Sequence, residues 1–371
     1  MERLSRNEQL TLYGLVRHPD HTDRELAAEL GLKPSTVTSI KNRLKNEGHF
    51  ETIRIPAFWR LGCELFCVGN FRLNPAAPTE ELLKKLREHL GPRGEVALAV
   101  TDATQLFIWA LCRKYSDAWS VSEDCIQKLA DEGIILLEGG TPRLHHFPLE
   151  QLELFNMFNA SSVLKKLFGL DVKDKDSDCG LNPEMRTRSL NRIEKQVLCG
   201  LVQYPELLDS ALAKKIGVSR QSVTKIKRRL ETEKYIATVR VPNYQKLDLQ
   251  IMLVGTYILS PSAPASAAKS LMEWVLHEMP PVFQFRCNRN GFGIGLARDY
   301  RAVHRTLREI CKKYTETGAL KKDPDIQIYS LPDVVYIKPL SFLPALKKIL
   351  DMDEKGKQEG ARPNVKKAVK G

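Results

Sequence analysis

The chain has 371 residues, which corresponds to about two to four domains of ordinary size. Hydrophobic residues make up 43% and charged residues 27%, a balance that excludes a disordered tail protein, a collagen and a disulfide-stapled miniprotein. The longest apolar run, near 251–259, is far shorter than the ~20 residues of a membrane-spanning helix, and residues 1–6 are not those of a signal peptide. We therefore expect a cytoplasmic protein with no membrane partner.

The net charge of +12 favours a polyanionic partner, and it is unevenly spread. Residues 1–60 carry +2, residues 186–246 carry +9, and residues 353–371 carry +3. The basic character therefore lies mostly in one internal segment and at the C-terminus.

The sequence is an internal duplication. Residues 8–75 align with residues 194–261 at an offset of 186 without a gap, and 25 of the 68 aligned positions are identical. A weaker match continues, since Leu-Lys-Lys-Leu at 164–167 returns as Leu-Lys-Lys-Ile at 346–349. A repeat of this length predicts that each half folds as the same structural unit.

The start of each repeat predicts three helices. Ser5-x-x-Glu8 and Asn191-x-x-Glu194 form capping boxes that begin the first helix. The residues that follow have the spacing of a helix-turn-helix: a small residue, a turn glycine and two apolar positions. A generic three-helix bundle is the alternative interpretation. The spacing occurs twice, at Ala27, Gly31, Val37 and Ile40 and at Ala213, Gly217, Val223 and Ile226.

A short wing strand is predicted after the third helix. Residues 50–56 and 236–242 alternate β-branched positions around an arginine and close with a proline. Each repeat therefore begins with a winged helix-turn-helix.

The rest of each half predicts the order strand–helix–strand–strand–helix–strand, which is ferredoxin-like. The first half has expected strands at 65–73, 95–100, 107–112 and either 134–137 or 144–147, and helices at 79–90 and 116–131. The second half has expected strands at 251–259, 282–287, 293–297 and 326–329, and helices at 267–279 and 301–315.

The predicted fold class is α+β, with two repeats of a winged helix-turn-helix followed by a ferredoxin-like βαββαβ domain. The expected domains are a winged helix-turn-helix at 1–60, a ferredoxin-like domain at 61–170, a linker at 171–188, a second winged helix-turn-helix at 189–246, a second ferredoxin-like domain at 247–352, and a flexible basic tail at 353–371.

With this spacing and domain order, the chain resembles the Lrp/AsnC family of feast/famine regulators. That family joins a winged helix-turn-helix to a ferredoxin-like effector and assembly domain, and it dimerises through the sheets. The resemblance implies a sequence-specific regulator of transcription that binds double-stranded DNA, one fused chain acting as a pseudo-dimer, with assembly into a larger homo-oligomer left open. The family's usual Gly-Asp-x-Asp-like run is replaced by residues 101–104 and 289–292, so a small-molecule effector has no predicted identity.

The outward side chains of the two recognition helices are the predicted DNA-binding residues, because such a helix lies in the major groove. The first copy offers Ser35, Thr36, Thr38, Ser39, Lys41, Asn42 and Arg43, with Arg54 on its wing. The second copy offers Ser219, Arg220, Gln221, Ser222, Thr224, Lys225, Lys227, Arg228 and Arg229, with Arg240 on its wing.

Base reading and phosphate contact call for different residues. Asn42, Arg220 and Gln221 suit base edges. The expected phosphate contacts are Lys41, Arg54, Lys227 and Arg240. A solvated charged helix face is the alternative. Because affinity follows the number of neutralised phosphates, we expect the second copy to anchor the protein and the first to refine site choice.

No catalytic or metal-binding motif stands out. The eight cysteines include no Cys-x-x-Cys pair, which favours buried, reduced thiols. His145 and His146 are adjacent on an expected strand and so point to opposite faces. The glycines of 291–295 lack the Gly-Lys-Ser/Thr ending of a phosphate loop. We therefore expect no metal and no cofactor.

Two other functions remain open. Siroheme decarboxylases are also built from paired units of this architecture, and that resemblance implies Arg and His residues just after the wing, around an acidic tetrapyrrole. Residues 57–60 and 243–246 stand there and contain no histidine, so we expect no enzyme activity. The near-neutral first copy also leaves open a protein-binding adaptor that has lost DNA binding.

Overall fold

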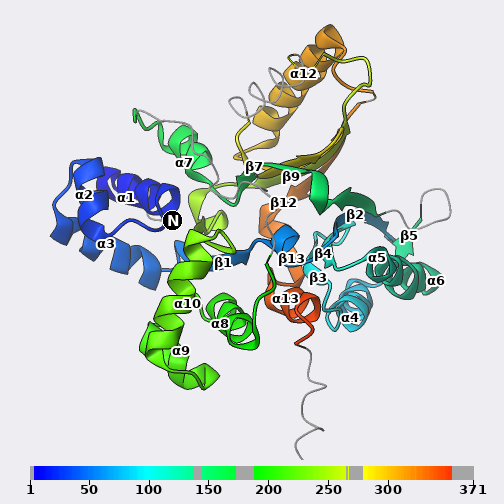
Figure 1. The fold of residues 1–371 in the computed structure, drawn as a ribbon. Coiled ribbons are helices and arrows are strands. Elements are labelled where there is room, and N and C mark those ends of the chain that lie inside the picture. The colour runs from blue at the N-terminus through cyan, green and yellow to red at the C-terminus, as the bar shows by residue number, and fades with distance from the viewer. Residues whose placement is uncertain are drawn as a thin grey trace, which may run out of the picture.

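The computed structural model describes residues 4–137, 144–172, 188–264, 266, 279–321 and 323–352 (Figure 1). The expected tail at 353–371, most of the linker at 171–188 and all but the last residue of the helix expected at 267–279 lie outside the described residues. No helix in the described part of the chain is long and apolar enough to cross a membrane.

Each half begins with three helices and a strand. The first unit contains α1 (Arg6–Arg17), α2 (Asp23–Leu30), α3 (Pro34–Asn46) and β1 (Phe50–Pro56). The second contains α8 (Arg192–Gln203), α9 (Asp209–Ile216), α10 (Arg220–Thr232) and β8 (Ile236–Pro242).

Local chemistry explains where these helices start and stop. The Asn191 amide donates to Glu194 Oε2 over 2.8 Å, and Asn191 Oδ1 accepts from the Glu194 amide over 3.0 Å, so two free amides of α8 are satisfied. Gly31 and Gly217 end α2 and α9 with φ of 67° and 73°. This left-handed conformation turns the chain into the recognition helix and favours glycine.

The wing strands pair with each other. β1 and β8 form an antiparallel ladder in which Ile53 lies opposite Val239, its own equivalent in the other repeat. Beyond the ladder, the Asn243 amide donates to the His49 carbonyl and the Ala57 amide donates to the Tyr235 carbonyl, again a symmetric pair of contacts. The register therefore has a local two-fold axis at Ile53 and Val239.

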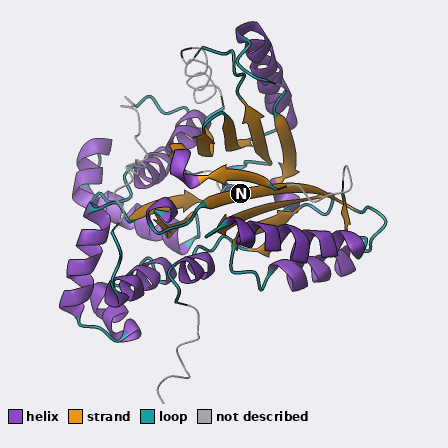
Figure 2. Cartoon of the chain, turned by 45° about the vertical axis from the view of Figure 1, so that its right-hand side comes forward, coloured by secondary structure: helices purple, strands orange, loops and turns teal. Residues whose placement is uncertain are grey.

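The remaining elements form two sheets with flanking helices (Figure 2). The first half contributes β2 (Leu65–Leu73), α4 (Thr79–Leu90), β3 (Val96–Thr101), β4 (Gln105–Cys112), α5 (Tyr115–Val121), a π-helical turn (Ser122–Gln127), α6 (Lys128–Asp131), β5 (Ile135–Leu136), β6 (His145–Pro148), β7 (Leu152–Met157) and α7 (Ser161–Phe168). The second half contributes β9 (Ile251–Ile258), β10 (Pro281–Cys287), β11 (Asn290–Ala297), α12 (Tyr300–Thr317), β12 (Asp325–Ser330), β13 (Val335–Lys338) and α13 (Leu343–Ile349). The predicted α+β fold class is confirmed.

The two halves exchange their last strands. One sheet has the order β13-β3-β4-β2-β5, with β6 also beside β2, and the other has the order β12-β9-β11-β10-β7. Val335 of β13 pairs with Thr101 of β3, whereas Met157 of β7 pairs with Phe283 of β10. Each sheet is thus completed by a strand from the other half, an exchange that was not predicted from the sequence.

Aromatic side chains fill the space between the sheets. The Phe66 and Phe285 rings lie 4.7 Å apart in an edge-to-face contact, and the Trp109 and Phe283 rings also lie 4.7 Å apart. All four side chains are buried in one hydrophobic cluster that draws on both halves. Because exposing an apolar sheet face to water is costly, burial of this cluster stabilises the packing of the two halves on each other.

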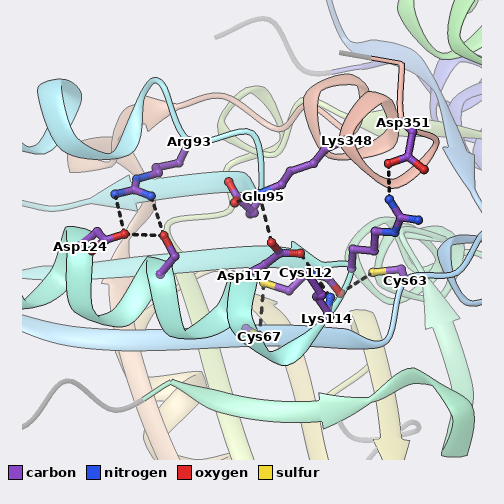
Figure 3. Close-up of polar contacts among 12 residues, drawn as sticks. Cys63, Cys67, Arg93, Glu95, Cys112, Lys114, Asp117, Asp124, Lys348 and Asp351 are labelled. Atoms are coloured by element: carbon purple, nitrogen blue, oxygen red, sulfur yellow. Dashed lines mark hydrogen bonds and ion pairs between the residues drawn. The ribbon is translucent and has the colours of Figure 1, made fainter. Parts of the chain in front are cut away.

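The helices after the exchanged strands lie at equivalent places in the two halves. α13 packs on α8 and on the first-half strands β3 and β4, and α7 packs on α1. Lys348 of α13 forms ion pairs with the buried carboxylate of Glu95 and, over 3.3 Å, with Asp117 (Figure 3). The end of the described chain is therefore fixed to the first half.

Candidate nucleic-acid interface

The α10 helix has one buried face and one exposed face. Val223, Ile226 and Leu230 are buried in the unit's core. The helical repeat of 3.6 residues places Gln221, Lys225 and Arg228 on the opposite side, where all three are exposed. Ser219 begins the helix, and its Oγ accepts a hydrogen bond from the Ser222 amide over 3.1 Å. Two predicted DNA contacts, Ser219 and Ser222, therefore also serve as the helix cap.

The α3 helix has the same geometry with different chemistry. Val37 and Leu44 are fully buried, and Ser35, Ser39 and Asn42 occupy the exposed positions equivalent to Gln221, Lys225 and Arg228. At these three positions the first copy is uncharged and the second carries two cations. Part of the predicted difference in charge between the copies thus lies on the outward faces themselves.

Four other predicted contacts tie the recognition helix to the helix before it. Asp209 accepts a hydrogen bond from Thr224 over 2.7 Å and forms an ion pair with Lys227 over 3.3 Å. Burial alone would raise the pKa of Asp209, but the Thr224 hydrogen bond and the Lys227 charge outweigh it and keep the pKa below its usual value. In the first copy the same network joins Asp23, Thr38 and Lys41, and the pKa of Asp23 is lowered in the same way.

Arg43 and Arg229 point back into their own units. Arg43 forms an ion pair with Glu8, and Arg229 forms one with Glu194. These capping-box carboxylates are only 7% and 2% exposed. An unpaired buried charge is costly, so these arginines stabilise the start of the first helix of each unit.

The wing arginines cross between the copies. Arg54 of β1 is buried and lies 3.7 Å from Glu231 of α10, whereas Arg240 of β8 donates to the Leu15 carbonyl of α1 over 3.1 Å. Burial lowers the pKa of both guanidinium groups, and nearby carboxylates oppose that effect. Both arginines therefore hold the two units together.

The predicted residues that lie outside these internal contacts are thus the ones that differ between the repeats. Side chains identical in both copies make the internal contacts just described, whereas the outward positions differ. Comparison of the repeats could have separated the two classes from sequence alone. Thr36 is half-buried, and the exposed residues outside these networks are Ser35, Ser39, Asn42, Arg220, Gln221, Lys225 and Arg228.

The stretches after the wings meet residues of the opposite half. The Asn243 amide donates to the carbonyl of His49 over 2.8 Å, and Lys246 donates to the Glu47 carbonyl. At the symmetric place the Arg60 guanidinium lies 4.2 Å from the centre of the Tyr235 ring. The fold therefore brings a histidine to the stretch 243–246, which contains none.

No protein-family model and no curated protein matches the sequence. Among solved structures, the chain is similar to the siroheme decarboxylase NirDL over 93% of this chain and 98% of that chain, with a TM-score of 0.51 and 11% identity. NirDL in complex with an iron-uroporphyrin III analogue matches with the same coverage, a TM-score of 0.50 and 12% identity. Escherichia coli AsnC is similar over 38% of this chain and 97% of its own, with a TM-score of 0.30 and 20% identity.

The whole-chain likeness to NirDL shows a shared fold and corrects one expectation. The winged helix-turn-helix plus ferredoxin-like fold that the Lrp/AsnC resemblance implied is confirmed. The expectation of no enzyme activity is contradicted, because a solved structure that shares this fold over 93% of the chain is that of an enzyme.

Proposed function

We propose that the chain binds double-stranded DNA sequence-specifically as a regulator of transcription, with α10 as its main recognition helix. The observation that carries this is the exposed set Arg220, Gln221, Lys225 and Arg228. In the described part of the chain, these four side chains make no ion pair or side-chain hydrogen bond. Arginine matches guanine edges and glutamine matches adenine edges, and the remaining cations suit phosphates.

The pairing of β1 with β8 supports a pseudo-dimer. Its local two-fold axis relates the two helix-turn-helix units as the axis of a homodimer relates two subunits. Such dimers bind two half-sites in register with the helical repeat of DNA. Because the exposed faces of α3 and α10 differ, we expect two unequal half-sites, one strongly and one weakly constrained. A small-molecule effector and a larger homo-oligomer stay predictions.

Selection of bound sequences from random duplex DNA tests this proposal. The intact chain should enrich a bipartite site with one dominant half. Gln221→Ala should lose the preference at one position of that half, and the matched control Ser35→Ala should leave it unchanged. Enrichment of no sequence over the random pool would contradict sequence-specific binding.

A second candidate function is tetrapyrrole decarboxylation, which the whole-chain likeness to NirDL favours together with the place of His49 beside Asn243. Titration with iron-uroporphyrin III, followed by the Soret absorbance, tests binding. Anaerobic incubation with siroheme, followed by mass spectrometry, tests reaction. His49→Ala should abolish the reaction, with the exposed His304→Ala as its control. An unshifted Soret band and unchanged siroheme would contradict this candidate.

A further inference from the structure

We propose that His18, His21 and Glu29 bind a divalent transition-metal ion of the zinc class. His18 follows α1, His21 lies in the loop before α2, and Glu29 is in the last turn of α2. The site would thus bridge two helices of the first helix-turn-helix unit. The proposal does not depend on DNA binding.

The three potential ligand atoms already converge. His18 Nε2 lies 2.9 Å from Glu29 Oε1, and His21 Nδ1 lies 3.5 Å from Glu29 Oε2. All three residues can place one ligand atom within 4.8 Å of the others. Zinc binds imidazole nitrogen and carboxylate oxygen at ~2.0–2.2 Å, so tetrahedral ligands stand roughly 3.3 Å apart. Modest side-chain rotation would therefore produce a three-ligand site with one open position.

The two imidazole rings are arranged as neutral rings would be. They stack with centroids 4.4 Å apart and planes at 8°, a contact that two imidazolium cations would oppose. Neutral imidazole is the metal-binding form, and imidazole with carboxylate suits zinc, copper or nickel.

Arg17 is the main opponent of a bound cation. Its Nε donates to His18 Nε2 over 3.0 Å, and its Nη1 donates to the Tyr13 hydroxyl over 2.6 Å. A metal ion would need the same His18 lone pair and would be repelled by the guanidinium. Removing the Arg17 charge should therefore tighten metal binding. If Arg17 served only to hold the fold together, its removal would be expected to weaken binding instead.

The second copy shows that the fold does not need this cluster. Tyr204 and Leu207 stand where the first copy has the two histidines, and Lys215 stands where it has Glu29. There Lys215 Nζ lies 4.4 Å from the centre of the Tyr204 ring. A cation–π contact thus joins the loop to α9 in the second copy, whereas the first copy has three metal-binding side chains at that place.

Zinc titration of the full chain, by calorimetry and by thermal unfolding in a thiol-free reductant, tests the proposal. The wild type should bind Zn²⁺ at this site and gain thermal stability by mass action. His21→Ala and Glu29→Gln should each weaken this binding by at least about tenfold, since even outer ligand partners matter that much. Arg17→Met should strengthen it, and His304→Ala should leave it unchanged.

Misfolding can be distinguished from loss of a ligand. His21 and Glu29 are exposed, and Glu29→Gln keeps the side-chain shape, so both variants should unfold at the wild-type temperature without zinc. Equal zinc affinity in the wild type, His21→Ala and Glu29→Gln would overturn the proposal. Weaker binding in Arg17→Met would overturn it as well.

Discussion

The two winged helix-turn-helix units share a scaffold and differ in the surface that they offer. Both contain the same aspartate–threonine–lysine network and the same arginine–glutamate pair beneath the recognition helix. On the outward side, Ser39 and Asn42 in one copy stand where Lys225 and Arg228 stand in the other. The residues of these shared networks are the same in both copies, whereas the outward positions of the recognition helices differ.

The difference teaches which charges can reach DNA. A cation bound to an internal carboxylate must break that pair before it neutralises a phosphate, and a free cation need not. A count of all cations therefore overstates the positive charge that each copy can offer to DNA. A count of only the cations outside ion pairs makes the difference between the copies clearer. The following predictions test that contrast, from the largest expected effect to the smallest.

Replacing two of the three cations of α10 that make no ion pair in the described part of the chain should have the largest effect. Lys225→Ala with Arg228→Ala should weaken binding to every sequence and lower the slope of log affinity against log salt by about two, if both meet phosphates. Fluorescence anisotropy over a salt series measures this slope. An unchanged slope would show that α10 does not lie on the DNA.

Replacing the predicted base-reading residue should have a smaller and more local effect. Gln221→Ala should cost ~1–3 kcal/mol at one base pair and little elsewhere, because an amide can pair with both groups of an adenine edge. Competition among single-base variants of the selected site measures the cost. A uniform loss at all positions would reassign Gln221 to the backbone.

The shared network should matter equally in both copies. Asp209→Asn and Asp23→Asn should each lower the free energy of unfolding by about 1–3 kcal/mol, since each carboxylate accepts a hydrogen bond and an ion pair. Chemical denaturation measures this loss. A clear difference between the two variants would show that the scaffold has diverged too.

The same network sets a pH dependence. Because both pKa values lie below their usual value, the stabilisation is fully present above the unfolded pKa of about 3.9. It is lost as the pH falls through the lower folded pKa. The gap in stability between wild type and either asparagine variant should therefore close in acid and remain constant between pH 5 and 8.

The smallest effect is expected from the matched pair on α3. Ser39→Ala with Asn42→Ala removes no charge and no core contact, so stability should change by less than ~0.5 kcal/mol. The salt slope should equal that of the wild type. If this variant loses more affinity than the α10 double variant, the first copy anchors the protein and the assignment is reversed.

Much of the fold could be predicted from the sequence because its local signals agree. The expected strand 65–73 and helix 79–90 coincide with β2 and α4 residue for residue. The exchange of β7 and β13 could not be predicted, because the alternation of apolar and polar residues indicates a strand but does not show which strand it pairs with. The equivalent strands β3 and β10 offer the same kind of backbone edge, and only the three-dimensional course of the chain selects one of them for β7.

The candidate site was predictable in outline. The helical periodicity of the sequence correctly assigned Val223 and Leu230 to the buried face of α10 and Gln221 and Arg228 to its exposed face. It could not show that Lys227 is paired, because its partner Asp209 lies 18 residues earlier on another helix. His18 and Glu29 were missed for the same reason, since helix packing and not sequence proximity brings them together.

The exchanged strands also bear on how occupancy responds to dilution. A regulator made of two separate subunits dissociates as its concentration falls. Each subunit then contacts an operator through only one recognition helix. Here β7 and β13 join the two halves of one covalent chain, so bringing the two proposed recognition helices together needs no bimolecular step. If the proposed DNA binding holds and one chain binds alone, occupancy of the DNA site should follow the first power of protein concentration.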